Sequence, residues 1–307
     1  MSDPALQPTP IHFTLGSRRL LSVPRTLTPL RFSLEDILKG ETPDLAHASD
    51  ESDGLRILSA PQALVARLEA RFPDHIKGGY EAYRRHYIAM DGSYEDYLAR
   101  FSGKTRSTLR RKQRKLAKLS GGELAITEHR SPAEIEAFLD AALPLSEKTY
   151  QTRLLDAGLP CDDVSRTEFL AQAEAGELRC FLLHYDGAPV AYLTLPIEGE
   201  TLVYAYLGYD PDHASLSVGT VLQMEALERL FAEQRFRYFD FTEGEGAHKA
   251  MFGTDNVECA SFLLLRRTLS NRLLLSARDG FDGTIARAKA LAAKSGALGS
   301  TRKFLRA

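Results

Sequence analysis

The run LRCFLLHYDGAPVAYLTLPIEGETLVYAYLGYD, residues 178–210, constrains the fold more than any other part of the chain. Asp186-Gly187 and Glu198-Gly199-Glu200 interrupt it with residues that favour tight turns. The segments between these turns are rich in aliphatic and aromatic residues, as strands are. The run therefore predicts three successive antiparallel strands.

Helices and further strands flank this run in a regular order. A strand over 123–130 precedes a helix that Ser131 caps, and a second helix covers 166–176. After the run, an amphipathic helix is expected from about Val218 to Gln234. A strand over 236–241, a short helix near Lys249 and a strand over 258–267 follow. The predicted order is β-α-α-β-β-β-α-β-α-β, and an earlier β-α-β stretch covers residues 55–90.

Length and composition indicate a soluble protein of about two domains. The chain has 307 residues, 44% hydrophobic and 26% charged, with a formal net charge of -2. Its three cysteines form no CxxC pair, which fits a reducing compartment. No signal peptide and no apolar run of the ~20 residues that span a bilayer is found. We therefore expect a cytoplasmic protein without a membrane span.

The segment from Ser102 to Lys118 is the most biased in the chain. It carries eight basic residues and no acidic one, so the remaining residues sum to -10. Leucines at helical spacing indicate a helix with a narrow buried stripe, and Gly121-Gly122 ends it. Its basic face is either a solvated surface docked on acidic residues or a binding surface for a nucleotide, an anionic polysaccharide or RNA. It has no interleaved aromatic residues for base stacking.

This order of elements resembles the GNAT acetyltransferase fold. Three pieces carry the resemblance: KTRSTLRRKQRKL, YDPDHASLSVGTVLQMEAL and FDFTEGEGAHKAMFG. It is closest to the CelD-like branch associated with cellulose and exopolysaccharide genes, which is related to the Fem peptidyltransferases, and it covers residues 94–267. The resemblance implies a mixed α/β (α+β) fold with a mostly antiparallel central sheet flanked by helices, in two tandem GNAT-like units of which the first is degenerate.

The expected domains follow from this resemblance. Residues 1–100 are the degenerate first unit, and residues 101–122 form a basic connecting helix. Residues 123–268 are the acyltransferase domain, and residues 269–307 form a C-terminal helix and a basic tail.

The resemblance implies acetyl-CoA or another acyl-CoA as donor, with no metal. In the GNAT fold the fourth strand separates from the fifth, and here these would be TLVYAYLGY and FRYFDF. The pantetheine arm would pair with the exposed edge, and the pyrophosphate would lie on the start of the next helix. The donor-binding residues are therefore expected to be Leu207, Ser217, Val218, Gly219 and Thr220. Ser217 also reads as an ordinary helix cap, because the glycine-rich phosphate loop of the family is reduced here.

The catalytic candidates lie on the two separating strands and on the turn TEGEG. Asp240, Glu243 or Glu245 is a candidate general base, although the glutamates are also typical of a solvated loop and Asp240 of a turn cap. Tyr204 and Tyr206 are candidate proton donors to a leaving thiolate. Strand alternation places these two tyrosines on one face and Tyr209 on the other.

Lys249 is the candidate contact for an anionic acceptor. It falls at the start of a short helix, where a cation opposes the helix dipole, so a binding role would explain its placement. The alternative is a surface lysine paired with a nearby glutamate of the turn.

Three functions remain open from the sequence. The first is an acyl-CoA-dependent N- or O-acyltransferase that acts on a small-molecule or glycan acceptor, in polysaccharide or cell-envelope metabolism. The second is a Fem-like transferase that uses aminoacyl-tRNA, the one reading in which a nucleic acid is a partner. The third is an inactive GNAT-like scaffold, which the reduced phosphate loop keeps open.

Overall fold

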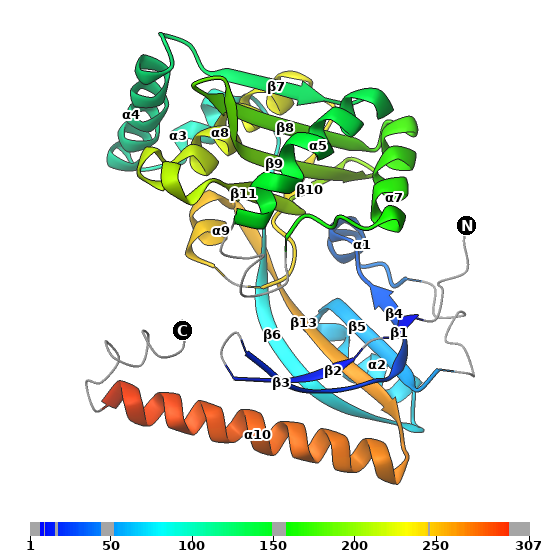
Figure 1. Cartoon of the computed structure of the whole chain (residues 1–307). Coiled ribbons are helices and arrows are strands. Elements are labelled where there is room, and N and C mark those ends of the chain that lie inside the picture. Colours follow the sequence, from blue (N-terminus) through cyan, green and yellow to red (C-terminus); the bar gives the residue numbers. More distant parts are fainter. Residues whose placement is uncertain are drawn as a thin grey trace. The chain divides into compact units, whose positions relative to one another are not determined.

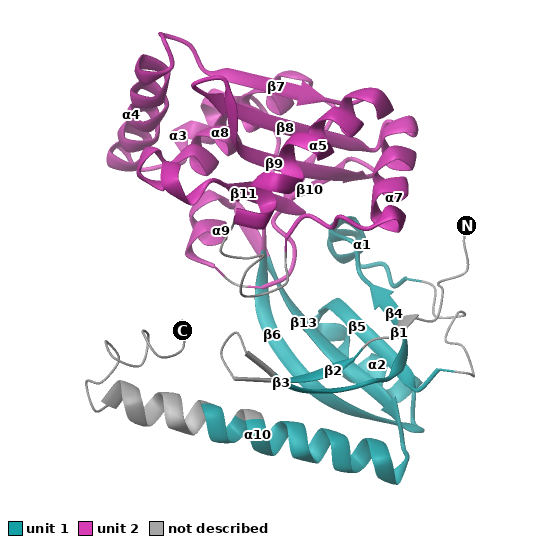
Figure 2. Cartoon of the chain, viewed as in Figure 1, with its two compact units in different colours: residues 1–85, 257–307 teal, residues 86–256 magenta. Residues whose placement is uncertain are grey.

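The computed structural model describes residues 7–8, 10–15, 18–43, 52–148, 158–244 and 246–294. Two compact units make up the chain: unit 1 comprises residues 1–85 and 257–307, and unit 2 comprises residues 86–256 (Figure 2). The chain enters unit 2 within β6 (His75–Ala89) and leaves it within β13 (Asp255–Arg266). The basic segment 101–122 thus lies in unit 2, the helix after residue 268 lies in unit 1, and the tail 295–307 lies outside the described residues.

Unit 1 is a sheet with short helices and one long helix (Figure 1). The sheet order is β1-β4-β5-β13-β6, in which β4 and β5 are parallel and β13 runs antiparallel to β5. A separate hairpin pairs β2 with β3. The other elements of this unit are β1 (Gln7–Pro8), β2 (Ile11–Leu15), β3 (Arg18–Val23), β4 (Thr26–Arg31), α1 (Leu34–Lys39), β5 (Gly54–Pro61), the 3-10 helix η1 (Gln62–Leu64), α2 (Val65–Arg71) and α10 (Leu269–Lys294).

Unit 2 contains the motifs that the sequence singled out. Its sheet runs in the order β6-β12-β10-β9-β8-β7, and β11 pairs with β9. Only β10 and β12 are parallel among these described pairs, so the mostly antiparallel sheet with flanking helices is confirmed. The elements are α3 (Tyr94–Ala99), α4 (Gly103–Leu119), β7 (Ala125–His129), α5 (Pro132–Lys148), α7 (Asp163–Glu174), β8 (Leu178–Tyr185), β9 (Ala188–Glu198), β10 (Thr201–Val203), β11 (Tyr206–Tyr209), the 3-10 helix η2 (Pro211–Leu216), α8 (Val218–Ala232), β12 (Tyr238–Asp240) and α9 (Ala247–Phe252).

Helices cover both faces of the unit 2 sheet (Figure 1). Successive side chains of β8 point to opposite faces and are apolar on both, so both faces must be covered. Cys180 and Leu182 pack with the apolar residues of α5 and α7. Phe181 and Leu183 point the other way, into a larger core with α3, α4 and α8. The second core includes Phe241 and Phe252, which flank the TEGEG turn, so this turn is held between buried aromatic residues.

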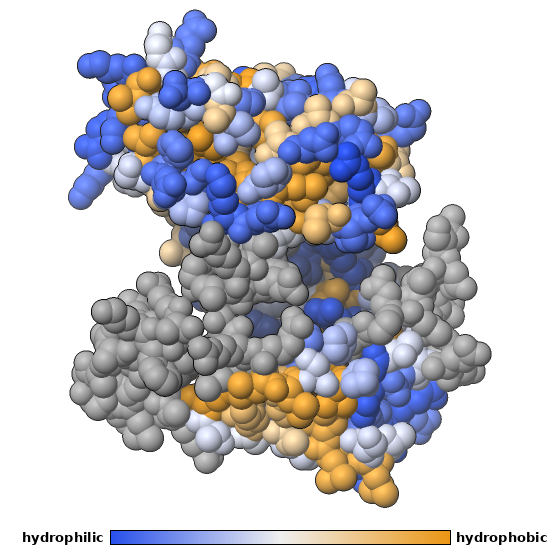
Figure 3. Space-filling model, viewed as in Figure 1, coloured by the Kyte–Doolittle hydropathy of each residue, from blue (hydrophilic) through white to orange (hydrophobic). Residues whose placement is uncertain are grey.

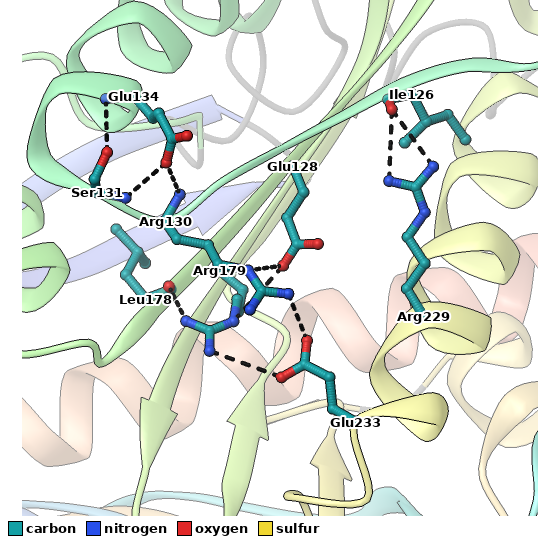
Figure 4. Close-up of polar contacts among 9 residues, drawn as sticks. All are labelled: Ile126, Glu128, Arg130, Ser131, Glu134, Leu178, Arg179, Arg229 and Glu233. Carbon is teal, nitrogen blue, oxygen red and sulfur yellow. Dashed lines mark hydrogen bonds and ion pairs between the residues drawn. The ribbon is translucent and has the colours of Figure 1, made fainter.

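A charged cluster holds the C-terminal end of α8 against the edge of the sheet (Figure 4). Arg130 Nη2 donates to Glu233 Oε1 at 2.7 Å, and its Nε donates to Glu128 Oε1. The guanidinium of Arg179 lies between the same two carboxylates, 3.7 Å from Glu128 Oε1 and 3.8 Å from Glu233 Oε2. Arg229 also reaches the backbone oxygen of Ile126. These contacts fix α8, whose other end is part of the candidate site.

Candidate functional site in unit 2

Strands β10 and β12 separate abruptly at the residue that follows β10. Their parallel ladder ends at the pair Val203 and Asp240. Tyr204 N–H still donates to the backbone oxygen of Asp240 at 2.8 Å, whereas Ala205 N–H donates to Thr194 of β9. Within the described part of the chain, strand β11 then pairs only with β9. The expected separation of TLVYAYLGY from FRYFDF is confirmed.

The separation leaves β11 with one open edge. Asp210 N–H donates to the backbone oxygen of Val190 at 2.9 Å, in register with the β9–β11 ladder. Hydrogen-bonded positions alternate along an antiparallel pair, so the N–H and C=O groups of Leu207 and Tyr209 point away from β9. An extended ligand that carries amide groups can pair with such an edge.

The N-terminus of α8 lies beside this edge. The first hydrogen bond of the helix runs from Val221 N–H to the Ser217 oxygen, so the N–H groups of residues 218–220 have no intrahelical acceptor. Ser217 has left-handed backbone angles (φ 57°, ψ 37°), and its side chain makes no capping hydrogen bond. Ser217 is thus the N-cap residue of α8, as the alternative interpretation expected, but it does not cap the helix through its side chain. The free N–H groups suit an anion.

Gly219 brings α8 and β11 into close contact. A Cβ atom built on it would lie 3.1 Å from Leu207 Cδ2 and 3.1 Å from Tyr209 Cδ1. A larger residue would therefore have to displace one of these side chains. The residues expected to bind the donor, from Leu207 to Thr220, thus lie together, along the open edge and the helix start.

Tyr204 and Tyr206 lie on opposite faces of the sheet, so the expectation of a common face is wrong. Tyr204 packs against the core that contains α8, with its ring centroid 5.4 Å from that of Phe241. Tyr206 packs against the α5–α7 core, 6.5 Å from the ring of Phe169. The change of hydrogen-bond partner at Ala205 breaks the alternation, as a bulge does. Burial raises the pKa of the Tyr204 hydroxyl well above its usual value.

Two of the acidic candidates, Asp240 and Glu243, lie at the end of β12 and shortly after it. Asp240 is completely buried, and its Oδ1 accepts a 2.9 Å hydrogen bond from Thr242 N–H, so the side chain caps the turn. Glu243 is partly exposed, and its backbone oxygen accepts a hydrogen bond from Lys249 Nζ. Glu245 lies outside the described residues.

Lys249 is the third residue of α9, a helix of only six residues. It counts equally as a last-turn residue, where a cation is favourable. The argument that Lys249 opposes the helix dipole is therefore wrong. Its hydrogen bond to the backbone oxygen of Glu243 holds the ammonium group near the residues that follow β12.

Two residues that the sequence did not single out meet at the same place. His248 Nε2 lies 2.7 Å from Oε1 of Gln223, which is completely buried. The His248 ring is 4.7 Å from that of Phe252 and 6.4 Å from that of Tyr204. Gln223 was detectable, because a polar residue between Leu222 and Met224 interrupts the buried face of α8.

The basic segment forms helix α4, which lies next to the start of α8 in unit 2. It packs against α8 and η2, the two elements that meet at Ser217. A groove runs along its exposed face, lined by Gly103, Arg106, Ser107, Arg110, Gln113 and Arg114. Arg110 also pairs with Glu95 at 2.8 Å. Figure 3 shows hydrophilic side chains gathered over this helix.

Residues 103–250 match the family model of the acetyltransferase (GNAT) domain. The matched region runs from α4 into α9 and thus includes every candidate residue above. No curated protein matches the chain.

Solved structures of low sequence identity are similar to this chain, and one of them exceeds a TM-score of 0.5. FemX has a TM-score of 0.53 and 11% identity, over 85% of this chain and 89% of that one. The C-terminal domain of a putative lysylphosphatidylglycerol synthetase from Agrobacterium fabrum has a TM-score of 0.48 and 13% identity, over 73% and 72%. The L-PGS from Bacillus licheniformis has a TM-score of 0.46 and 15% identity, over 73% and 72%. At these identities the likeness concerns the fold.

Two further findings concern all of the described residues, not the site alone. None of their helices is long and apolar enough to cross a membrane. Among the same residues, no group of three or more histidine, cysteine, aspartate and glutamate side chains is arranged to hold a metal ion.

Proposed function

We propose that the protein is an acyl-CoA-dependent N- or O-acyltransferase that moves an acyl group directly from the thioester to an amine or a hydroxyl. The observation that carries this proposal is the separation of β11 from β12 beside the free N–H groups of α8. The open N–H and C=O groups of Leu207 and Tyr209 would pair with the amides of pantetheine. The pyrophosphate would bind at residues 218–220.

The basic face of α4 supports an anionic donor. The phosphate loop lacks the usual extra glycines and arginine, and α4 packs on the two elements that form this loop. Arg106, Arg110 and Arg114 line the groove of that helix. Their charges would attract the phosphates of coenzyme A over several ångströms.

The acceptor is proposed to be a small molecule or a glycan with an anionic group, which Lys249 would contact. A role in cellulose, exopolysaccharide or cell-envelope metabolism follows from the CelD-like resemblance of the sequence. Acyl-CoA as donor and the cytoplasm as location belong to the same proposal.

The donor is tested by thermal unfolding with coenzyme A, acetyl-CoA and a longer acyl-CoA. A ligand at a hundred times its dissociation constant adds about 2.7 kcal/mol of stability. Gly219→Glu should abolish the shift, because it adds a carboxylate at the helix start and displaces Leu207 or Tyr209. Gly280→Glu on α10 is the matched control, since a Cβ there meets nothing within 4 Å. Absence of a shift with every thioester contradicts the donor assignment.

A second function is favoured by the eight basic residues of the segment containing α4: transfer from aminoacyl-tRNA. It requires tRNA binding whose affinity falls steeply with salt, because cations on the protein displace counterions. Replacing Arg106, Arg110 and Arg114 by glutamine should flatten that salt dependence. Binding of tRNA without a thioester-induced thermal shift would favour this function over the first. If neither donor binds, the inactive scaffold becomes the better reading.

A further inference from the structure

The His248 imidazole is held at one edge by a buried polar partner. Its Nε2 edge faces Gln223 at 2.7 Å, and Gln223 has no exposed surface. His248 is exposed as a residue, and the opposite edge of the ring, which carries Nδ1, faces away from Gln223. The rings of Phe252, Phe241 and Tyr204 surround it at centroid distances of 4.7, 6.3 and 6.4 Å.

The contact with Gln223 determines which nitrogen carries the hydrogen. An amide oxygen can only accept, so Nε2 must donate to Oε1, and the neutral ring then has its lone pair on Nδ1. The lone pair therefore lies on the Nδ1 edge of the ring, which faces away from Gln223. The amide nitrogen of Gln223 is buried and finds no partner among the described residues. An acceptor oxygen from a bound ligand would satisfy it.

The charged and titratable groups near the ring favour its neutral form. Burial lowers the pKa of His248 from its ordinary value, and the charges of Lys112 on α4 and Lys249 on α9 lower the pKa further. Tyr204, on the strand side, stays protonated because burial raises the pKa of its hydroxyl. Gln223, on α8, carries no charge. A neutral imidazole is the form that can accept a proton at pH 7.

We propose that His248 is the general base of the acyl transfer, and that Gln223 is the positioning residue that fixes its tautomer. This inference rests on the proposed acyltransferase function. The acceptor N–H or O–H gives its proton to Nδ1 as the nitrogen or oxygen bonds to the carbonyl carbon. The carbon–sulfur bond then breaks, and the imidazolium returns the proton to the leaving thiolate. The products are the acylated acceptor and the free thiol.

The first test reads the tautomer without any turnover. The imidazole resonances of the full chain are followed by NMR from pH 5 to 8, and His248 is assigned by its absence in His248→Gln. We expect the Nε2–H tautomer and a titration below pH 6.5, the ordinary histidine pKa. Gln223→Glu should move this titration upward, because a carboxylate stabilises the imidazolium. An Nδ1–H tautomer would overturn the proposal.

The second test is the pH profile of transfer to an acceptor found by screening. The low-pH limb of kcat/KM should coincide with the NMR titration of His248 and rise with it in Gln223→Glu. His248→Ala should lose about 100-fold in kcat, and added imidazole should restore part of the rate. His184→Ala on β8 is the control and should keep the wild-type profile.

Different results would overturn the base role of His248 and the proposed transferase function. Normal transfer by His248→Ala, with its low-pH limb unchanged, would overturn the base role alone. Binding of no thioester and no aminoacyl-tRNA by the wild-type chain would overturn the proposed function and the base role with it.

Discussion

Tyr204 and Tyr206 are two residues apart, yet they pack on opposite faces of the unit 2 sheet. The bulge between them turns Tyr204 toward His248 and leaves Tyr206 against Phe169. The two side chains therefore have different surroundings although the sequence pattern treats them alike.

Tyr204→Phe should lower kcat of acyl transfer about tenfold or more, because it removes a buried, protonated hydroxyl whose ring lies 6.4 Å from that of the proposed base His248. Tyr206→Phe is the matched control and should leave kcat within about twofold. Steady-state kinetics with saturating donor measures both. Equal effects of the two substitutions would contradict the proposal that the sheet face with Tyr204, and not the face with Tyr206, takes part in catalysis.

Lys249→Met should raise the KM for an anionic acceptor about tenfold and leave the thermal shift with acyl-CoA unchanged. The expected reason is loss of the ammonium group that is held at the backbone of Glu243, while the donor edge on β11 is untouched. The control is Lys118→Met, at the far end of α4. An unchanged acceptor KM in Lys249→Met would remove this role.

Glu233→Gln should destabilise the protein by about 1–3 kcal/mol, because it removes the charge that faces the buried Arg179. The Arg179 side chain is only 6% exposed, so solvent cannot replace the lost partner. In the control Glu200→Gln, the pair with Arg237 is more than half exposed on both sides, and the loss should stay below about 0.5 kcal/mol. Urea denaturation followed by circular dichroism compares the two variants.

Stability at low pH should depend on Glu134. Backbone N–H groups of Ser131 and Arg130 donate to its carboxylate and lower its pKa from 4.5 to about 2. A lowered pKa means that the carboxylate stabilises the fold above pH 4.5 and that this contribution disappears as the pH falls toward 2. The melting-temperature difference between wild type and Glu134→Gln should shrink across that window. The same decline in Glu168→Gln, on α7, would contradict this cause.

Much of the fold could be predicted because it follows from local patterns. The turns at Gly187 and Gly199, the capping box of Ser131 and Glu134, and the apolar face of α8 each act over a few residues. Together they define the order of strands and helices, and the order implies the separation of β11 from β12.

The errors come from features that a periodic pattern does not encode. One shifted residue at Ala205 reverses the face of every later side chain in the strand, and no residue type marks it. The dipole argument for Lys249 has no force in a helix as short as α9, in which the third residue also falls in the last turn. The pair of His248 and Gln223 is 25 residues apart in sequence, so only the packing of α9 against α8 brings it together.

The passage of the chain through β6 and β13 has a consequence for synthesis on the ribosome. Strand β13 lies between β5 and β6 in unit 1, and it is translated only after all of unit 2. Unit 2 is one continuous segment and can complete its core first, whereas the N-terminal strands must wait for a strand more than 160 residues later. The part of the chain made first is thus the last to finish folding.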